Sequence, residues 1–420
     1  MISGRSPFCH SRKLISCGMT RVKLAIVSTH PIQYYAPVFR ALAESADVTP
    51  RVFFTWSQAA SGRVFDPGFG ATFEWDVPLR DGYDHVFVAN VAGDPKPTHF
   101  RGVRNPSLIR EITEWGAGAV LVYGWNLHSH LSAMRHFKGR IPVLFRGDST
   151  LLDSSSRIRR LARALWLRWV YSNADTVISV GQNNRDYYLW SGVRPERIAF
   201  APHSVDTERF RELRGDDAGR VEKWRDELGI RGDAVAILYA AKFLPKKDPM
   251  LLLDAFISLQ PSAHLIFVGN GELETAMRER ARGLPNVHFL PFQNQGDMPL
   301  IYRVGDVYVL PSRGPGETWG LALNEAMASG RAVIAGSRVG GARDLVEPGA
   351  TGWVFESRSR EDLVHVLRAA VSLGREGLMR MGEEAQRRSS SWSTEAAAAA
   401  IASTVISACA ARHRRAPVLA

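Results

Sequence analysis

The 420-residue sequence contains few cysteines: Cys9, Cys17 and Cys409, which lie near its two ends. This scarcity excludes a disulfide framework and a cysteine-bound metal site, and it is typical of a reducing compartment. No run of about 18 apolar residues occurs, which predicts that no segment spans a membrane. Neither zinc-finger spacing nor an aromatic RNA-binding signature is present, so nucleic acid is not the expected partner.

Positive charge is abundant instead. Lysine and arginine total 53 against 42 acidic residues, which gives a net charge of +11 and an isoelectric point near 9.8. This balance favours anionic partners, of which a membrane surface and a phosphorylated substrate remain. Residues 1–20 are polar, basic and free of acids, and they lack the apolar core of a secretory signal. We treat them as an N-terminal extension: a targeting segment, or a stretch upstream of a true start at Met19.

Short apolar runs separated by helical patterns recur along the whole chain. Such alternation predicts α/β architecture with parallel sheets, and the length predicts two domains. We expect two doubly wound Rossmann-like domains facing a cleft. Residues 57–83 are rich in Gly, Asp and aromatics and predict a long ordered loop on the substrate side.

The most informative stretch is residues 311–330. A buried strand ends at Pro311, a loop carries Glu317, and a helical pattern runs from about Gly320 to Ser329. A helix start suits a phosphate group, and Gly320 lets the backbone approach it. Glu325 is then placed to accept hydrogen bonds from a ribose diol, and Glu317 can meet hydroxyls on whatever the phosphates carry. Taken singly, each glutamate is explained equally well as a helix cap or a solvated residue.

Together these residues resemble the Glu-x7-Glu signature of retaining glycosyltransferases with the GT-B fold, especially family 4. The resemblance implies that Glu317 contacts the donor sugar, that Glu325 contacts the nucleotide ribose, and that the backbone from Trp319 to Leu321 meets the diphosphate. Thr318-Trp319 departs from the Gly-Phe that is common in the family. The matching residues are Pro311, Ser312, Glu317, Gly320, Leu321, Glu325, Ala326, Gly330, Gly340, Gly341, Val346, Gly349 and Gly352.

Three further segments of the second half extend the resemblance. Lys242 and Lys247 match the family's Gly-Arg-Leu-x-x-x-Lys loop and would stabilise the charge of a leaving diphosphate. Lysine replaces the more usual arginine at Lys242, so point charge remains without bidentate geometry. Gly269 follows a strand and is expected against the nucleotide. Residues 202–210 resemble the family's interdomain hinge, which implies domains at residues 21–203 and 204–391. The resemblance also implies that a C-terminal helix, followed by a tail, occupies residues 392–420 and crosses back onto the first domain.

The first half offers acceptor-side candidates. His30, Gln33 and Tyr34 follow the first strand, and Arg146 follows a later one, so all should face the cleft. Relatives often place a histidine near the donor sugar, and His128 is the nearest here, although a capping or packing role explains it at least as well.

The segment at residues 157–170 predicts an amphipathic helix. Its apolar face either packs on the first sheet, with solvated arginines around it, or lies on an anionic membrane. The predicted apolar face comprises Ile158, Leu161, Ala162, Leu165 and Trp169, and the arginines away from it are Arg157, Arg160, Arg163 and Arg168.

The expected function is a retaining hexosyl-type glycosyltransferase that moves a sugar from a UDP-, GDP- or ADP-linked donor to a glycan or lipid-linked acceptor. We expect the protein to act in cell-surface glycan or glycolipid assembly in the cytoplasm. Peripheral attachment to the inner face of the membrane fits the net positive charge of the chain. No Asp-x-Asp pair lies at a strand end, so no metal and no cofactor are expected. A nucleotide-sugar epimerase of the same fold would need acid/base carboxylates in the cleft. A non-catalytic glycan-binding protein would be expected to lose Glu317 or the lysines.

Overall fold

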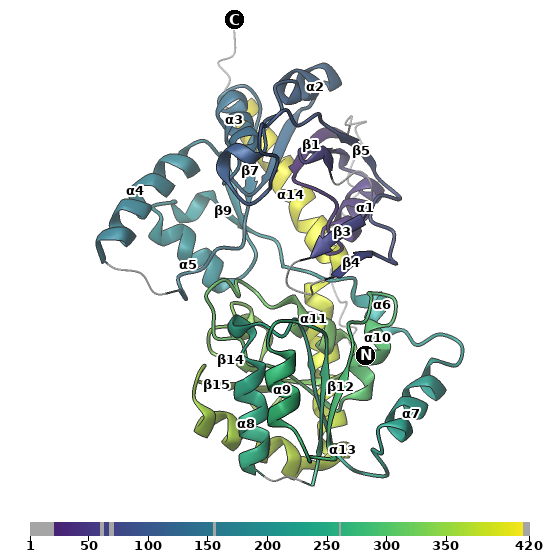
Figure 1. Cartoon of the computed structure of the whole chain (residues 1–420). Coiled ribbons are helices and arrows are strands. Elements are labelled where there is room, and N and C mark those ends of the chain that lie inside the picture. Colours follow the sequence, from purple (N-terminus) through teal and green to yellow (C-terminus); the bar gives the residue numbers. More distant parts are fainter. Residues whose placement is uncertain (1–20, 59–62, 67–70, 154–156, 260–261, 415–420) are drawn as a thin grey trace, which may run out of the picture.

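The computed structural model of the chain describes residues 21–58, 63–66, 71–153, 157–259 and 262–414 (Figure 1). The expected N-terminal extension therefore lies outside the described residues. Figure 1 shows two halves stacked one above the other, with the N-terminal sheet in the upper half and the C-terminal sheet in the lower half.

The upper half is built on a seven-stranded parallel sheet in the order β5-β2-β1-β6-β7-β8-β9. Neighbouring residues of β1 alternate between its two faces: Leu24 and Ile26 pack in one core cluster, and Ala25 and Val27 pack in another. Helices cover both faces, as in a doubly wound domain. The strands are β1 Val22–Ser28, β2 Val48–Phe54, β5 Asp84–Phe87, β6 Ala119–Tyr123, β7 Val143–Arg146, β8 Thr176–Ser179 and β9 Ile198–Phe200; the helices are α1 Ala36–Glu44, α2 Leu108–Trp115, α3 His128–Phe137, α4 Arg157–Ser172 and α5 Gln182–Trp190.

The lower half is built on a six-stranded parallel sheet in the order β12-β11-β10-β13-β14-β15. It too has a core cluster on each face. The strands are β10 Ala236–Ala240, β11 His264–Val268, β12 Val287–Leu290, β13 Val307–Leu310, β14 Ala332–Gly336 and β15 Gly352–Phe355; the helices are α6 Thr207–Arg211, α7 Asp217–Glu227, α8 Pro249–Leu259, α9 Glu274–Arg280, α10 Met298–Val304, α11 Leu321–Ala328, α12 Ala342–Leu345 and α13 Arg360–Ser389.

The order of each sheet places its functional loops. In the upper sheet the chain order reverses between β1 and β6, and in the lower sheet it reverses between β10 and β13. Ligands of such sheets bind outside the carboxyl ends of the strands at these switch points. The loop after β1 carries Gln33, the loop after β10 carries Lys247, and the loop after β13 carries Glu317. The predicted fold class, two Rossmann-like domains facing a cleft, is confirmed.

Helix α14, Thr394–His413, joins the two halves. It leaves the lower half and packs its buried residues, among them Ala398, Ile401 and Val405, in the core cluster that contains α1 (Figure 1). By length and composition alone, α14 is also apolar enough to cross a membrane. Counting unbroken apolar runs missed this property, because serine and threonine interrupt the alanines.

Two local predictions failed. Residues 57–83 are not only loop, since β3 Arg63–Asp66 and β4 Ala71–Glu74 form an antiparallel hairpin within them. The predicted apolar face of α4 does not pack on the sheet: Leu161 and Leu165 are 66% and 63% exposed, and Trp169 is also exposed. The sheet is covered instead by Leu167, Val170 and Tyr171, a second apolar stripe on the same helix.

Candidate active site

A cavity of about 580 Å³ lies between the two sheets, at the switch points described above. The upper half contributes residues from the segments after β1, β4 and β7 and from the hinge, and the lower half contributes the loops after β10, β11, β12 and β13. The residues that matter below are His30, Gln33, Tyr34, Trp75, Asp148, His203, Lys242, Lys247, Gly269, Phe292, Gln293, Gln295, Glu317, Thr318, Trp319, Gly320, Leu321 and Glu325. All the predicted residues of the lower half therefore line one cavity.

Glu317 is the centre of a polar cluster in this cavity. Its Oε2 accepts a charge-assisted hydrogen bond from Nζ of Lys247 and another, at 2.8 Å, from the hydroxyl of Ser312. Both members of the ion pair are mostly buried. The two partly desolvated charges interact strongly with each other. Each can also bind a ligand: the carboxylate of Glu317 accepts hydrogen bonds from hydroxyls, and the ammonium of Lys247 donates to phosphate oxygens. Lys242 lines the same cavity.

Two glycines are required where the backbone borders the cavity. Gly320 begins α11 with φ +91°, and a Cβ there would lie 2.6 Å from Cγ1 of Val339. Gly269 has φ +139°, and its Cβ would lie 2.3 Å from the carbonyl oxygen of Ala241. With no side chain at position 320, the first turn of α11 offers its orphan N–H groups to an anion in the cavity.

Glu325 lies one turn further along α11 and is only 2% exposed. Oε2 accepts a 2.7 Å hydrogen bond from the hydroxyl of Tyr302, and Oε1 has no hydrogen-bond partner among the described residues. Burial raises the pKa of Glu325, an effect opposed by the Tyr302 hydrogen bond, by the charge of Arg209 and by a hydrogen bond from Tyr34. This acceptor oxygen lies at the wall of the cavity, and the Tyr34 hydroxyl, which also acts on the pKa of Glu325, lies beside the carboxylate.

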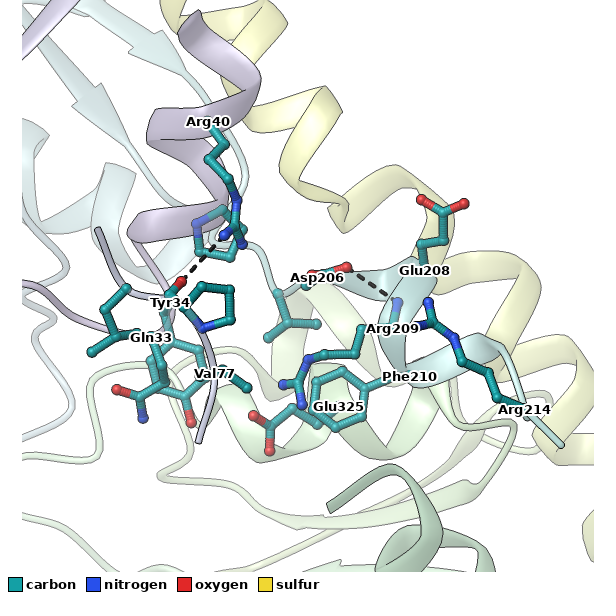
Figure 2. Close-up of a pocket in the computed structure, with 14 residues that line it drawn as sticks. Gln33, Tyr34, Arg40, Val77, Asp206, Glu208, Arg209, Phe210, Arg214 and Glu325 are labelled. Carbon is teal, nitrogen blue, oxygen red and sulfur yellow. Dashed lines mark hydrogen bonds between the residues drawn. The ribbon is translucent and has the colours of Figure 1, made fainter. Parts of the chain in front are cut away.

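A smaller cavity of about 270 Å³ lies on the other side of Glu325 (Figure 2). It shares Gln33, Tyr34 and Glu325 with the larger one and is otherwise lined by α1, α6 and residues 77–79. In Figure 2 the Arg209 side chain extends toward Glu325. Its guanidinium donates to Gln295, at 2.5 Å to the carbonyl oxygen and 2.9 Å to Oε1.

Trp319 is used mainly at the junction of the two halves. Its indole N–H donates to Oδ1 of Asn324 at 2.8 Å, and its ring lies 5.6 Å from that of His203 and 5.1 Å from that of Trp392. A Cβ on Gly181 would come within 2.4 Å of the indole. This leaves the backbone amide as the group of Trp319 that suits the expected phosphate contact.

The upper half supplies two cavity residues that sequence reasoning missed. Asp148 accepts a 2.7 Å hydrogen bond from the hydroxyl of Thr318, the neighbour of Glu317. Burial lowers the pKa of His203 to about 4, so its imidazole is neutral near pH 7. The only sequence feature that could have identified either residue as part of the cavity is the position of Asp148, just beyond the carboxyl end of a strand.

The structure does not bring His128 or Arg146 to the cavity. The His128 ring lies 5.8 Å from that of Phe100, and burial lowers its pKa. Arg146 is buried and donates to the carbonyl oxygens of Ala201 and Pro202, at 3.0 and 2.8 Å, which fixes the start of the hinge. A strand end could be predicted from the sequence, but the direction of its side chains could not.

Two family models match the chain. "Glycosyltransferase Family 4" matches residues 63–209 and "Glycosyl transferases group 1" matches residues 220–388. A D-inositol 3-phosphate glycosyltransferase of Geodermatophilus obscurus is 30% identical over 247 residues, 55% of this chain and 52% of that protein. A GDP-mannose-dependent alpha-(1-6)-phosphatidylinositol monomannoside mannosyltransferase of Mycobacterium tuberculosis is 28% identical over 228 residues, 51% of this chain and 57% of that protein. The matches thus span about half the length of these relatives.

Solved structures share the whole fold. The Anabaena protein HepE in complex with UDP superimposes with a TM-score of 0.67 at 17% identity, covering 92% of this chain and all of that one. At this identity the likeness concerns the fold, which is the GT-B arrangement of two Rossmann-like domains about a cleft.

Proposed function

This chain belongs to the group 1 glycosyltransferases of family 4, and we propose that it transfers a sugar from a nucleoside-diphosphate sugar to an acceptor hydroxyl with retention of configuration. The observation that carries the proposal is the Glu317–Lys247 pair beside the open helix start at Gly320, with the buried acceptor oxygen of Glu325 on the same helix. UDP-, GDP- and ADP-linked donors all fit this pattern.

In the proposed complex the ribose hydroxyls donate to Glu325, and the diphosphate lies on the first amides of α11 with Lys242 and Lys247 beside it. Glu317 then leaves Lys247 to accept hydrogen bonds from the donor sugar. Thr318 and Asp148, hydrogen-bonded to each other, border the sugar from the two halves. His30, Gln33 and Tyr34 face the acceptor.

The proposed reaction breaks the bond between the sugar's anomeric carbon and the β-phosphate oxygen. The acceptor oxygen forms a new bond to that carbon on the same face, and its proton passes to the departing phosphate. The two lysines and the helix start stabilise the negative charge that develops on the diphosphate. We propose that these groups suffice without a divalent metal.

We also propose a membrane-proximal acceptor and a peripheral site of action at the cytoplasmic face. The matched relatives are named for an inositol phosphate and a phosphatidylinositol mannoside, which supports a phosphate-bearing or lipid-linked acceptor in cell-surface glycan or glycolipid assembly. Helix α4 supplies the second observation. Exposed Leu161, Leu165, Trp166 and Trp169 share this helix with exposed Arg159, Arg160, Arg163 and Arg168, which matches an anionic lipid surface.

The test measures nucleotide release and new glycoside from UDP-, GDP- and ADP-sugars, with EDTA present and an acceptor panel that includes inositol phosphates. We expect turnover with one donor class, and a loss of about 10²-fold in kcat for Glu317→Gln. Glu383→Gln, an exposed glutamate on α13, is the matched control and should leave kcat unchanged.

Other results would contradict parts of this proposal. Full turnover by Glu317→Gln would remove Glu317 from the reaction, and activity restored only by magnesium or manganese would show that the lysines are not sufficient. An isomeric nucleotide sugar as product would make the protein an epimerase. Binding without turnover for every donor would leave a glycan-binding protein.

A further inference from the structure

The segment Glu74–Leu79, which follows the β3–β4 hairpin of the upper half, bridges the two halves. Asn294 in the lower half donates its side-chain N–H to the carbonyl oxygen of Glu74 at 2.8 Å. The amide of Gly296 donates to the carboxylate of Asp76, 3.0 Å from each oxygen. On the other side, Arg40 of α1 donates to the carbonyl oxygen of Pro78 at 3.2 Å (Figure 2). The segment is therefore fixed from both domains.

Trp75 stands between these anchoring contacts and lines the main cavity. The facing wall, after β12, contributes Phe292, Gln293 and Gln295. This end of the cavity thus has an aromatic side chain from each half and amide groups from the lower one. Such a combination suits a flat aromatic ligand with a polar edge.

This end of the cavity also lies next to Glu325. Arg209 holds Gln295 by two hydrogen bonds, and the same arginine acts on the charge of Glu325. Gln295, and with it the end of the cavity that Trp75 lines, therefore lies beside the proposed ribose site at Glu325.

We propose that Trp75 forms one wall of the nucleobase subsite, so that the donor nucleotide is bound by both halves. The inference rests on the proposed function, since it takes the ligand to be a nucleoside diphosphate. Asp76 is a positioning residue: its carboxylate accepts from the amide of Gly296, and a Cβ at position 296 would lie 2.7 Å from Oδ2, so a side chain there would displace the carboxylate from this contact.

The experiment measures dissociation constants of UDP, GDP, ADP and inorganic diphosphate for the full-length protein by calorimetry. For the tightest nucleotide, Trp75→Ala should weaken binding about tenfold, as expected for the loss of base stacking. Trp75→Phe should retain most of the affinity because it keeps a ring. Diphosphate has no base, so Trp75→Ala should leave its affinity unchanged.

Two further variants separate positioning from general damage. Asp76→Ala should weaken nucleotide binding in the same direction as Trp75→Ala, and Asp76→Asn should retain more affinity because its amide oxygen still accepts from Gly296. Phe100→Ala removes an exposed aromatic ring of the upper half that lies outside the cavity, and it should have no effect.

The outcomes are distinguishable. Nucleotide affinity unchanged by Trp75→Ala overturns the inference and leaves the proposed function standing. An equal loss for nucleotide and diphosphate also overturns it, because the effect would then be a general distortion of the cavity. A wild-type protein that binds none of the three nucleotides overturns the proposed function and, with it, the subsite.

Discussion

At the scale of single residues, the buried carboxylate of Glu325 lowers the stability of the folded protein and is also able to bind the hydroxyls of a ligand. Burial raises its pKa, so the folded protein binds a proton here more tightly than the unfolded chain does. The stabilisation from this group is present below its ordinary pKa of 4.5 and is lost as the pH rises through the raised value. Near neutral pH the carboxylate therefore costs stability, which a ligand that donates two hydroxyls would recover.

We predict opposite effects of Glu325→Gln on stability and on binding. The variant should unfold at a higher temperature than the wild type near pH 7.5, and the difference should shrink toward pH 4.5 as the wild-type carboxyl is protonated. Nucleotide affinity should fall about tenfold or more, because hydrogen bonds to a charged acceptor are lost. Thermal melts across pH and calorimetry with the nucleotide check both. A variant less stable than the wild type throughout would contradict the role of burial.

Sequence reasoning placed the lower-half residues of the site, and in the upper half it placed His30, Gln33 and Tyr34 at the cleft but missed Asp148 and His203. Glu317, Gly320 and Glu325 lie within one loop and helix, so local spacing was enough to bring them together. Asp148 and His203 reach the cavity only because the two halves pack closely, and no local pattern encodes that packing. The roles of all these residues, the absence of a metal requirement, and the boundary at residues 203 and 204 stay predictions.

At the scale of elements, α4 shows why a periodic pattern does not identify the buried face. The helix carries two apolar stripes, and the sequence alone favoured the one with Leu161, Leu165 and Trp169. The structure buries the other, with Leu167 and Val170, against the sheet. Figure 1 shows α4 at the outer edge of the upper half. Leu161, Leu165 and Trp169 on this helix are exposed.

We predict that the protein sediments with vesicles of anionic lipid and does not sediment with neutral ones. Combined Leu161→Ser, Leu165→Ser and Trp169→Ser should abolish binding, and Arg159→Ser with Arg168→Ser should weaken it most at low salt. Leu373→Ser with Met379→Ser, exposed apolar residues of α13, is the matched control. If neither vesicle type carries the wild-type protein down, the membrane role of the stripe is wrong.

At the scale of the whole molecule, hydrogen bonds join the halves beside the cavity. The amide of Gln182 donates to the carboxylate of Asp344 at 3.0 Å, and the side chain of Asn183 donates to the carbonyl oxygen of Gly340 at 2.8 Å. Arg343 and Asp186 form an ion pair at 2.8 Å. The strand pattern predicted both sheets, but nothing in it predicted this set of contacts, because each one pairs α5 with α12 or the segment just before α12, more than 150 positions away.

Trp319 approaches Gly181 so closely that the two domains can close over the cleft only if position 181 has no side chain. Gly181 has an extended backbone that any residue can adopt, so only space forbids a side chain there. In Gly181→Ala the new methyl group should clash with the indole of Trp319, so that each domain stays folded but the two domains cannot close fully. We expect a larger radius of gyration by small-angle scattering and about a tenfold lower kcat. Gly93→Ala, where a methyl group meets nothing within 4 Å, is the control. The reach of the catalytic groups would then be limited by a residue that never touches the substrate.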